Sequence, residues 1–192
     1  MKKMAIFAGI AALSLGGCAA TVSPVQVTRF HLGGQIAPGG IAIESATGGD
    51  SNSLEFGTYA AAVRRQLTII GLGETAPLYT AIVDVNRDKR AAEAARSPFS
   101  IGIGGGTGGG GLGVGIGTSF GIGKPKARQI IATQLSVKIK RRSDQSILWE
   151  GRAQTEALET APAAQVGIAA DKLAKALFSG FPGTSGATIL VP

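Results

Sequence analysis

One segment of this chain is unusually rich in glycine, because residues 100–123 contain 13 of its 30 glycines. Glycine inside a strand costs conformational entropy. The apolar residues of this segment recur at every second position, as in Leu112-Gly-Val114-Gly-Ile116. A period of two places the side chains on one face of a strand and leaves bare backbone on the other. The pattern predicts a glycine-rich β-hairpin over residues 98–123, with a flexible loop as the alternative.

These glycines do not form a nucleotide-binding motif. A phosphate-binding loop reads GxxxxGK followed by Ser or Thr, whereas here Lys124 is followed by Pro125. A dinucleotide-binding fingerprint can be aligned on residues 104–109, but no helical pattern follows it. A bare glycine face instead favours close approach by another strand, a partner protein or lipid.

The N-terminus has the parts of a bacterial lipoprotein leader. Lys2 and Lys3 precede an apolar run over residues 4–13, whose length is typical of a signal peptide. Residues 15–18, Leu-Gly-Gly-Cys, resemble a lipobox, in which small residues admit the chain to signal peptidase and the cysteine thiolate receives lipid. Cys18 is the only cysteine and has no internal disulfide partner. We predict a signal peptide over residues 1–17, cleavage before Cys18, and acyl chains such as palmitate on that residue.

An uncleaved anchor and an ordinary cleaved signal are the alternatives to a lipobox. Residues 4–22 are uncharged and about long enough to span a bilayer, but Gly16 and Gly17 weaken the second half of this run. Ala19 follows the cysteine, whereas an aspartate at this position resembles an inner-membrane retention signal. Because Ala19 is not an aspartate, the predicted location is the outer membrane, on its periplasmic face. Two or three acyl chains would anchor the protein there stably, which a single chain would not.

The rest of the chain fits one small domain. A chain of 192 residues can bury a core without disulfides or metal. Residues 18–26, which include Pro24, are predicted to be a lipidated tether, and residues 27–192 a single domain. The net charge of +7 is spread over several segments, which argues against nucleic-acid binding.

Local periodicity predicts the elements of this domain. Alternating patterns indicate strands, and apolar residues at helical spacing indicate two amphipathic helices, the first capped by Asn52 or Ser53. We predict an α+β fold: a mostly antiparallel sheet covered on one face by the two helices, with the glycine-rich hairpin. The predicted strands cover residues 25–32, 41–44, 78–85, 128–141 and 147–155, and the helices residues 54–70 and 162–178.

No catalytic constellation is visible. His31 is the only histidine, so a Ser-His-Asp arrangement would have to use it. No set of His, Cys, Asp and Glu has the spacing of a zinc site. Two carboxylates that are distant in the sequence can lie close together in the fold, as in a glycosidase. A hydrolase is therefore the least favoured alternative. The prediction is a protein that is not an enzyme and has no cofactor or metal.

Four segments resemble the bacterial lipoproteins that share the Domain of Unknown Function 4136. They are residues 54–63 (LEFGTYAAAV), the glycine-rich residues 100–123, residues 148–153 (LWEGRA) and residues 177–183 (LFSGFPG). With the lipobox they span most of the mature chain, although residues 76–96 are more charged than the family leads us to expect. The resemblance implies an envelope lipoprotein with no established activity and no catalytic residues to carry over.

These observations predict a non-enzymatic, outer-membrane-anchored periplasmic lipoprotein that is a structural or protein-binding component of the cell envelope. Its expected partners are the membrane, through lipid on Cys18, and an envelope protein, through the glycine-rich hairpin. The alternative is a small-ligand or lipid-binding lipoprotein that uses the apolar face of the hairpin as a lid.

Overall fold

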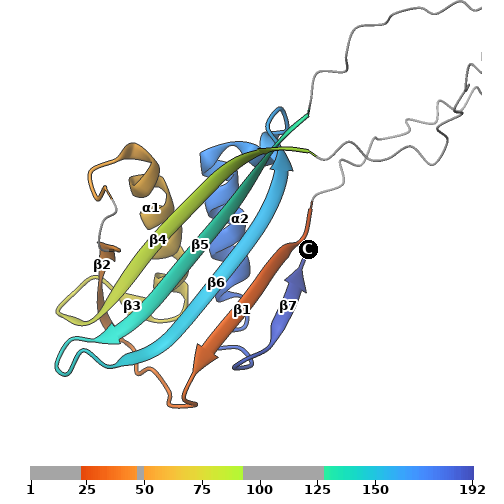
Figure 1. Cartoon of the computed structure of the whole chain (residues 1–192). Helices are drawn as coiled ribbons and strands as arrows, with labels where there is room; N and C mark the ends of the chain where they lie inside the picture. Colours follow the sequence, from red (N-terminus) through yellow and green to blue (C-terminus); the bar gives the residue numbers. More distant parts are fainter. Residues whose placement is uncertain (1–22, 47–49, 93–127) are drawn as a thin grey trace, which may run out of the picture.

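The computed structural model describes residues 23–46, 50–92 and 128–192. The predicted signal peptide, Cys18 and the glycine-rich hairpin at residues 98–123 lie outside the described residues. No helix in the described part of the chain is both long and apolar enough to cross a membrane. In chain order the elements are β1 (Val25–His31), β2 (Gly39–Ser45), α1 (Leu54–Ile69), β3 (Leu72–Gly73), β4 (Pro77–Ala91), β5 (Gln129–Arg141), β6 (Ile147–Leu158), the 3-10 turn η1 (Pro162–Ala164), α2 (Val166–Phe178) and β7 (Thr188–Val191) (Figure 1).

The seven strands form one mixed sheet in the order β3-β2-β4-β5-β6-β1-β7. The prediction of a mostly antiparallel sheet is therefore wrong. Strand β2 pairs in parallel with both β3 and β4, because the chain crosses over through α1 and returns before it enters β4. Alternation along a strand looks the same in either direction, so the local pattern carries no information about the direction of the neighbouring strand.

Both helices lie against one face of the sheet, behind the strands in Figure 1. Every second residue of β5 from Leu135 to Ile139 is fully buried toward them. Leu67 of α1 and Leu173 of α2 complete this core from the helix side. Within the described residues, no helix covers the other side of the sheet, which we call the open face.

The first strand begins where the sequence predicts it. Strand β1 starts at Val25, so its first two residues overlap residues 18–26, the segment predicted as a tether, and the domain boundary stays a prediction. The side chains of Val25 and Val27 are fully buried, because the alternation of β1 directs them toward the helices. The segment between Cys18 and the sheet is correspondingly short.

Helix α1 begins at a side-chain cap. The Oγ of Ser53 accepts a hydrogen bond from the backbone N–H of Phe56 at 3.0 Å. This bond satisfies one of the four N–H groups that the first turn of a helix leaves without an intrahelical partner. Of the two cap residues that the sequence suggested, Asn52 and Ser53, the structure selects Ser53.

Candidate functional site

The open face of the sheet carries polar side chains and two neighbouring hollows. The first hollow has a volume of about 470 Å³ and lies near the beginning of β1 and the end of β4. The second, of about 350 Å³, lies further along the sheet on β4, β5 and β6. Gln134 lines both hollows, so they form one continuous polar surface.

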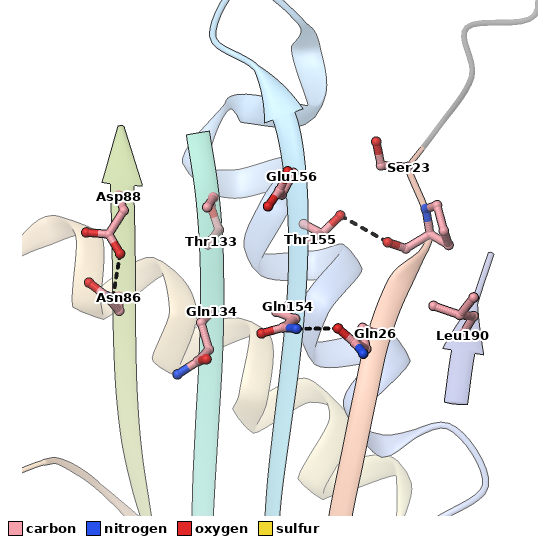
Figure 2. Close-up of a pocket in the computed structure, with 12 residues that line it drawn as sticks. Ser23, Gln26, Asn86, Asp88, Thr133, Gln134, Gln154, Thr155, Glu156 and Leu190 are labelled. Carbon is pink, nitrogen blue, oxygen red and sulfur yellow. Dashed lines mark hydrogen bonds between the residues drawn. The ribbon is translucent and has the colours of Figure 1, made fainter. Parts of the chain in front are cut away.

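Four carboxamide side chains form a row across the first hollow (Figure 2). The strand register pairs Asn86 with Gln134, Gln134 with Gln154, and Gln154 with Gln26. These residues therefore occupy directly opposed positions on β4, β5, β6 and β1. Because neighbouring strands lie about 4.8 Å apart, the row extends over roughly 14 Å. We call these four residues the amide row.

Hydrogen bonds hold part of the amide row in place. Gln154 donates its side-chain N–H to the side-chain oxygen of Gln26. Asn86 donates to the carboxylate of Asp88 at 2.8 Å. Gln134 has only a long contact of 3.5 Å with the hydroxyl of Ser136. The row thus keeps unused donors and acceptors that face solvent.

Carboxylates border the amide row on one side. Asp88 and Glu156 lie opposite Ala132 on the two strands that flank it, and both line the first hollow. Glu156 is paired with Arg90 at 2.5 Å, whereas Asp88 accepts only the amide hydrogen bond of Asn86 within the described residues. The row itself is uncharged, and its border carries the carboxylate of Asp88 together with the Glu156–Arg90 ion pair.

The second hollow has a mixed charge. Lys138, Lys140 and Arg152 line it together with Asp84 and Glu150. Lys138 lies 3.9 Å from the carboxylate of Glu150, and both side chains are partly exposed. Ion pairs of this kind contribute little to stability. The lysines of β5 therefore form part of a solvated face rather than a separate basic site.

An exposed apolar patch lies at the opposite end of β1 from Val25. Phe30 is 55% exposed, Leu32 is 96% exposed and Ile147 is 47% exposed. With the partly buried Leu148 they line a shallow hollow of about 310 Å³. We call these four residues the distal patch. Apolar residues grouped in this way are typical of a contact surface.

Two of the segments that resemble the lipoprotein family meet in the core. Trp149 stacks on Phe178 with a centroid distance of 5.4 Å and lies 5.3 Å from Phe181 at an angle of 48°. Its indole N–H donates to the carbonyl oxygen of Pro182 at 3.0 Å. Residues 148–153 and 177–183 therefore owe their pattern to packing, with Trp149 at the centre.

Arg29 is buried beside the same cluster, with 4% of its surface exposed. Its guanidinium donates hydrogen bonds of 2.9 Å to the carbonyl oxygens of Ala176, Leu177 and Ser179. These carbonyls belong to the end of α2, where the helix dipole favours a cation. Burial lowers the pKa of Arg29 from its usual value. Arg29 is a capping residue for α2.

His31, the only histidine, is also held by backbone groups. The N–H of Gly33 donates to Nδ1 at 3.1 Å, so Nε2 carries the proton and donates to the carbonyl oxygen of Gly183 at 3.0 Å. Across residues 23–46, 50–92 and 128–192, no three His, Cys, Asp or Glu side chains group as metal ligands would. Through its contact with Gly183, His31 holds the segment after α2 against the end of β1.

Tyr59 of α1 carries a buried polar atom. Its hydroxyl makes no hydrogen bond of good geometry within the described residues, although Thr133 is close enough to lower its pKa slightly, and the side chain is fully buried. Burial raises the pKa of Tyr59 to about 12, although the positive charge of Arg87 opposes this effect. Arg87 in turn pairs with Glu55 at 3.1 Å and donates to the carbonyl oxygen of Ala164.

We expect Tyr59 to make the domain sensitive to alkaline pH. Its folded-state pKa of about 12 exceeds the ordinary value near 10, so between these values the folded state binds more protons and stability falls as pH rises. The contribution is about 2 kcal/mol between pH 9 and pH 11.5. Urea denaturation at both pH values measures it. Tyr59→Phe should show a smaller fall than the unmodified protein, and equal falls would contradict this role of Tyr59.

The sequence did not reveal the amide row or the distal patch. Each of the four amides occupies a polar position of an alternating strand, which is an ordinary signal by itself. Only the register of four strands places them side by side. The signal for the distal patch is an apolar residue, Leu32, directly after a strand, and taken alone it indicates only the end of that strand. Cys18, the predicted lipidation site, lies five positions before Ser23, the first described residue.

The comparison with curated proteins finds a related sequence. The chain is 34% identical over 209 aligned residues to a Zymomonas mobilis subsp. mobilis protein named Uncharacterized protein ZMO1243. The match covers 86% of this chain and 79% of that protein. No protein-family model matches the chain, so the resemblance to Domain of Unknown Function 4136 stays a prediction.

Two solved structures show distant similarity. A PelC dodecamer from Paraburkholderia phytofirmans has 10% sequence identity and a TM-score of 0.44, with 83% of this chain and 99% of that chain covered. A PDZ domain protein from Parabacteroides distasonis has 13% identity and a TM-score of 0.48. This second match covers 88% of the present chain, which spans only 39% of that protein.

Proposed function

The chain belongs to the family of the Zymomonas mobilis protein ZMO1243, and we propose that it is a non-enzymatic lipoprotein of the outer membrane that binds a protein partner in the periplasm. In this proposal, lipid on Cys18 attaches the protein to the membrane. The lipobox at residues 15–18 and the resemblance to the Domain of Unknown Function 4136 lipoproteins support this attachment. One observation carries the binding role: exposed apolar side chains group in the distal patch, at the end of β1 opposite to Val25.

A short tether restricts where the domain sits. Cys18 precedes Val25, the first residue of β1, by seven positions, so the chain between them spans at most about 25 Å. The beginning of β1 is therefore the end of the domain that faces the membrane. The end of β4 and the beginning of β5 lie at this same end of the sheet (Figure 1).

The distal patch points away from the membrane in this arrangement. Strand β1 runs from Val25 to His31, which adds about 20 Å between the anchored end and the patch. The tether covers that distance only if most of its residues are extended back along β1, so we propose the orientation in which it is not folded back. Phe30 and Leu32 are thus presented to the periplasm, where an exposed apolar surface fits a protein contact. The predicted contact through the glycine-rich hairpin remains a separate proposal at the membrane-facing end.

We propose a protein that is not an enzyme because the side chains that could take part in catalysis have structural roles. Both ring nitrogens of His31 are engaged by backbone groups. Arg29, the most buried cation among the described residues, caps α2. Glu156 on the open face is paired with Arg90. Each of these groups has a structural explanation.

We expect Cys18→Ser to release the protein from the membrane. Without the thiol no thioether to diacylglycerol can form, and the folded domain should appear in the soluble periplasmic fraction. Membranes washed with high salt, followed by immunoblotting of both fractions, measure the distribution. If the variant stays in washed membranes although its leader has been removed, the lipid anchor is wrong.

Crosslinking from the distal patch tests the binding role. A photoreactive amino acid at Leu32, which is 96% exposed, should give a discrete protein adduct in living cells. The matched control is Leu54, which is 91% exposed at the start of α1, where we expect none. A third probe at Leu112 reports on the glycine-rich segment. Adducts that are absent at Leu32, or that are identical at Leu32 and Leu54, would contradict the proposal.

A further inference from the structure

We propose that the amide row is a binding site for an uncharged, hydroxyl-rich chain such as a neutral glycan. The row comprises Asn86, Gln134, Gln154 and Gln26, and lies on the open face of the sheet (Figure 2). This proposal goes beyond the anchor and the distal patch and does not depend on either of them.

The hydrogen-bonding chemistry of the row matches hydroxyl groups. A carboxamide offers donors and an acceptor on one planar group, and a hydroxyl group likewise donates and accepts. The side-chain amide of Gln134 is nearly unpaired, with its long contact to Ser136. The bond between Gln154 and Gln26 leaves the carbonyl of Gln154 and the amide group of Gln26 available. A ligand with hydroxyls on successive units meets these groups one after another.

The arrangement of the row also matches an extended chain. Its members occupy directly opposed positions on four adjacent strands, so they repeat at about 4.8 Å. The next position in the row, on β7, is Leu190, which lies opposite Gln26 and is 69% exposed. This apolar side chain provides a surface for the C–H face of a sugar ring. The hollow above the row, with its volume of about 470 Å³, accommodates several such units.

Other ligand classes fit this surface less well. An anionic chain would approach the carboxylate of Asp88, which has no ion pair among the described residues, and would be repelled by it, whereas the charge of Glu156 is balanced by Arg90. An apolar ligand would remove water from the amides without replacing their hydrogen bonds, which is unfavourable. A neutral polyhydroxylated chain avoids both penalties. The carboxylates at the border supply additional acceptors for its hydroxyl groups.

Nuclear magnetic resonance of the full mature chain tests this proposal in a detergent without a sugar headgroup. The probes are maltoheptaose, cellohexaose and chitohexaose, with hexagalacturonic acid as the anionic comparison. We expect at least one neutral oligosaccharide to shift the side-chain amide signals of the row at millimolar concentration. The comparison should bind at least tenfold more weakly. This readout uses the unmodified protein, so it does not depend on a variant that folds.

Variants of the row provide the second arm. The double variant Gln134→Leu, Gln154→Leu should weaken binding by about tenfold. The matched control is Gln165→Leu, because Gln165 is exposed and makes no side-chain cap bond at α2. The proposal is overturned if none of the neutral probes shifts these signals at about 10 mM, which is on the order of the weakest useful affinity. Equal binding by the double variant, or by the anionic hexamer, would also overturn it. Membrane release of Cys18→Ser and the Leu32 adduct are unaffected by these outcomes.

Discussion

Replacing Arg29 with methionine should lower the free energy of unfolding by about 3–5 kcal/mol. The substitution keeps much of the apolar length of the side chain but removes its guanidinium. Three carbonyl oxygens at the end of α2, those of Ala176, Leu177 and Ser179, lose their donor. Since Arg29 is only 4% exposed, water does not easily replace these bonds. Urea denaturation followed by circular dichroism measures the change.

Two variants check the reason for this loss. Arg152 lies on the neighbouring strand β6 but is exposed on the open face, so Arg152→Met should change stability by less than about 0.5 kcal/mol. Arg29→Lys keeps a positive charge but not the planar fork that reaches several carbonyls. It should therefore lie between the unmodified protein and Arg29→Met. If Arg29→Met is as stable as the unmodified protein, the capping role is wrong.

Replacing Gly151 with alanine should lower the free energy of unfolding by about 3 kcal/mol. A Cβ at this position would overlap the ring of Trp149 and lie 2.8 Å from the side chain of Leu177. Trp149 cannot easily move, because it stacks on Phe178 and donates to the carbonyl of Pro182. The core must therefore repack around the added methyl group, and urea denaturation measures the cost.

A second glycine provides a control of the opposite sign. Gly57 lies inside α1, and a Cβ there meets nothing within 4 Å. Gly57→Ala should stabilise the protein by about 0.5–1 kcal/mol, because alanine loses less backbone entropy in a helix. Trp149→Phe should reduce the cost of Gly151→Ala, since the smaller ring leaves space for the methyl group. Purely additive effects of the two substitutions would exclude the proposed clash.

Local patterns predicted the helices more reliably than they predicted the sheet. The apolar residues of α1 and α2 recur at helical spacing, and the structure confirms both helices within a few residues. The strands were also recognisable from alternation, although β4 and β6 extend beyond the predicted residues 78–85 and 147–155. The residues that extend β4 at its C-terminal end are charged or polar except for Ala91, whereas β6 is extended by Glu156, Ala157 and Leu158.

The position of Arg29 in its strand was visible in the sequence, but its role as a cap for α2 was not. It occupies an inward position of β1, in line with Val25 and Val27, so a cation on an apolar face was visible in the sequence. Its partners are the carbonyls near residue 177, which lie 148 positions away along the chain. No local pattern links these two segments.

The sequence by itself determined the properties that depend on neighbouring residues: the helices and most strand positions. The lipidation of Cys18 stays a prediction. Tertiary structure alone decided the parallel direction of β2 and β4, the burial of Trp149 against residues 177–183, and the alignment of the amide row. The physical reason is the range of the interactions. Helical and strand periodicity repeats over a few residues, whereas sheet register and core packing join segments that are tens to more than a hundred residues apart.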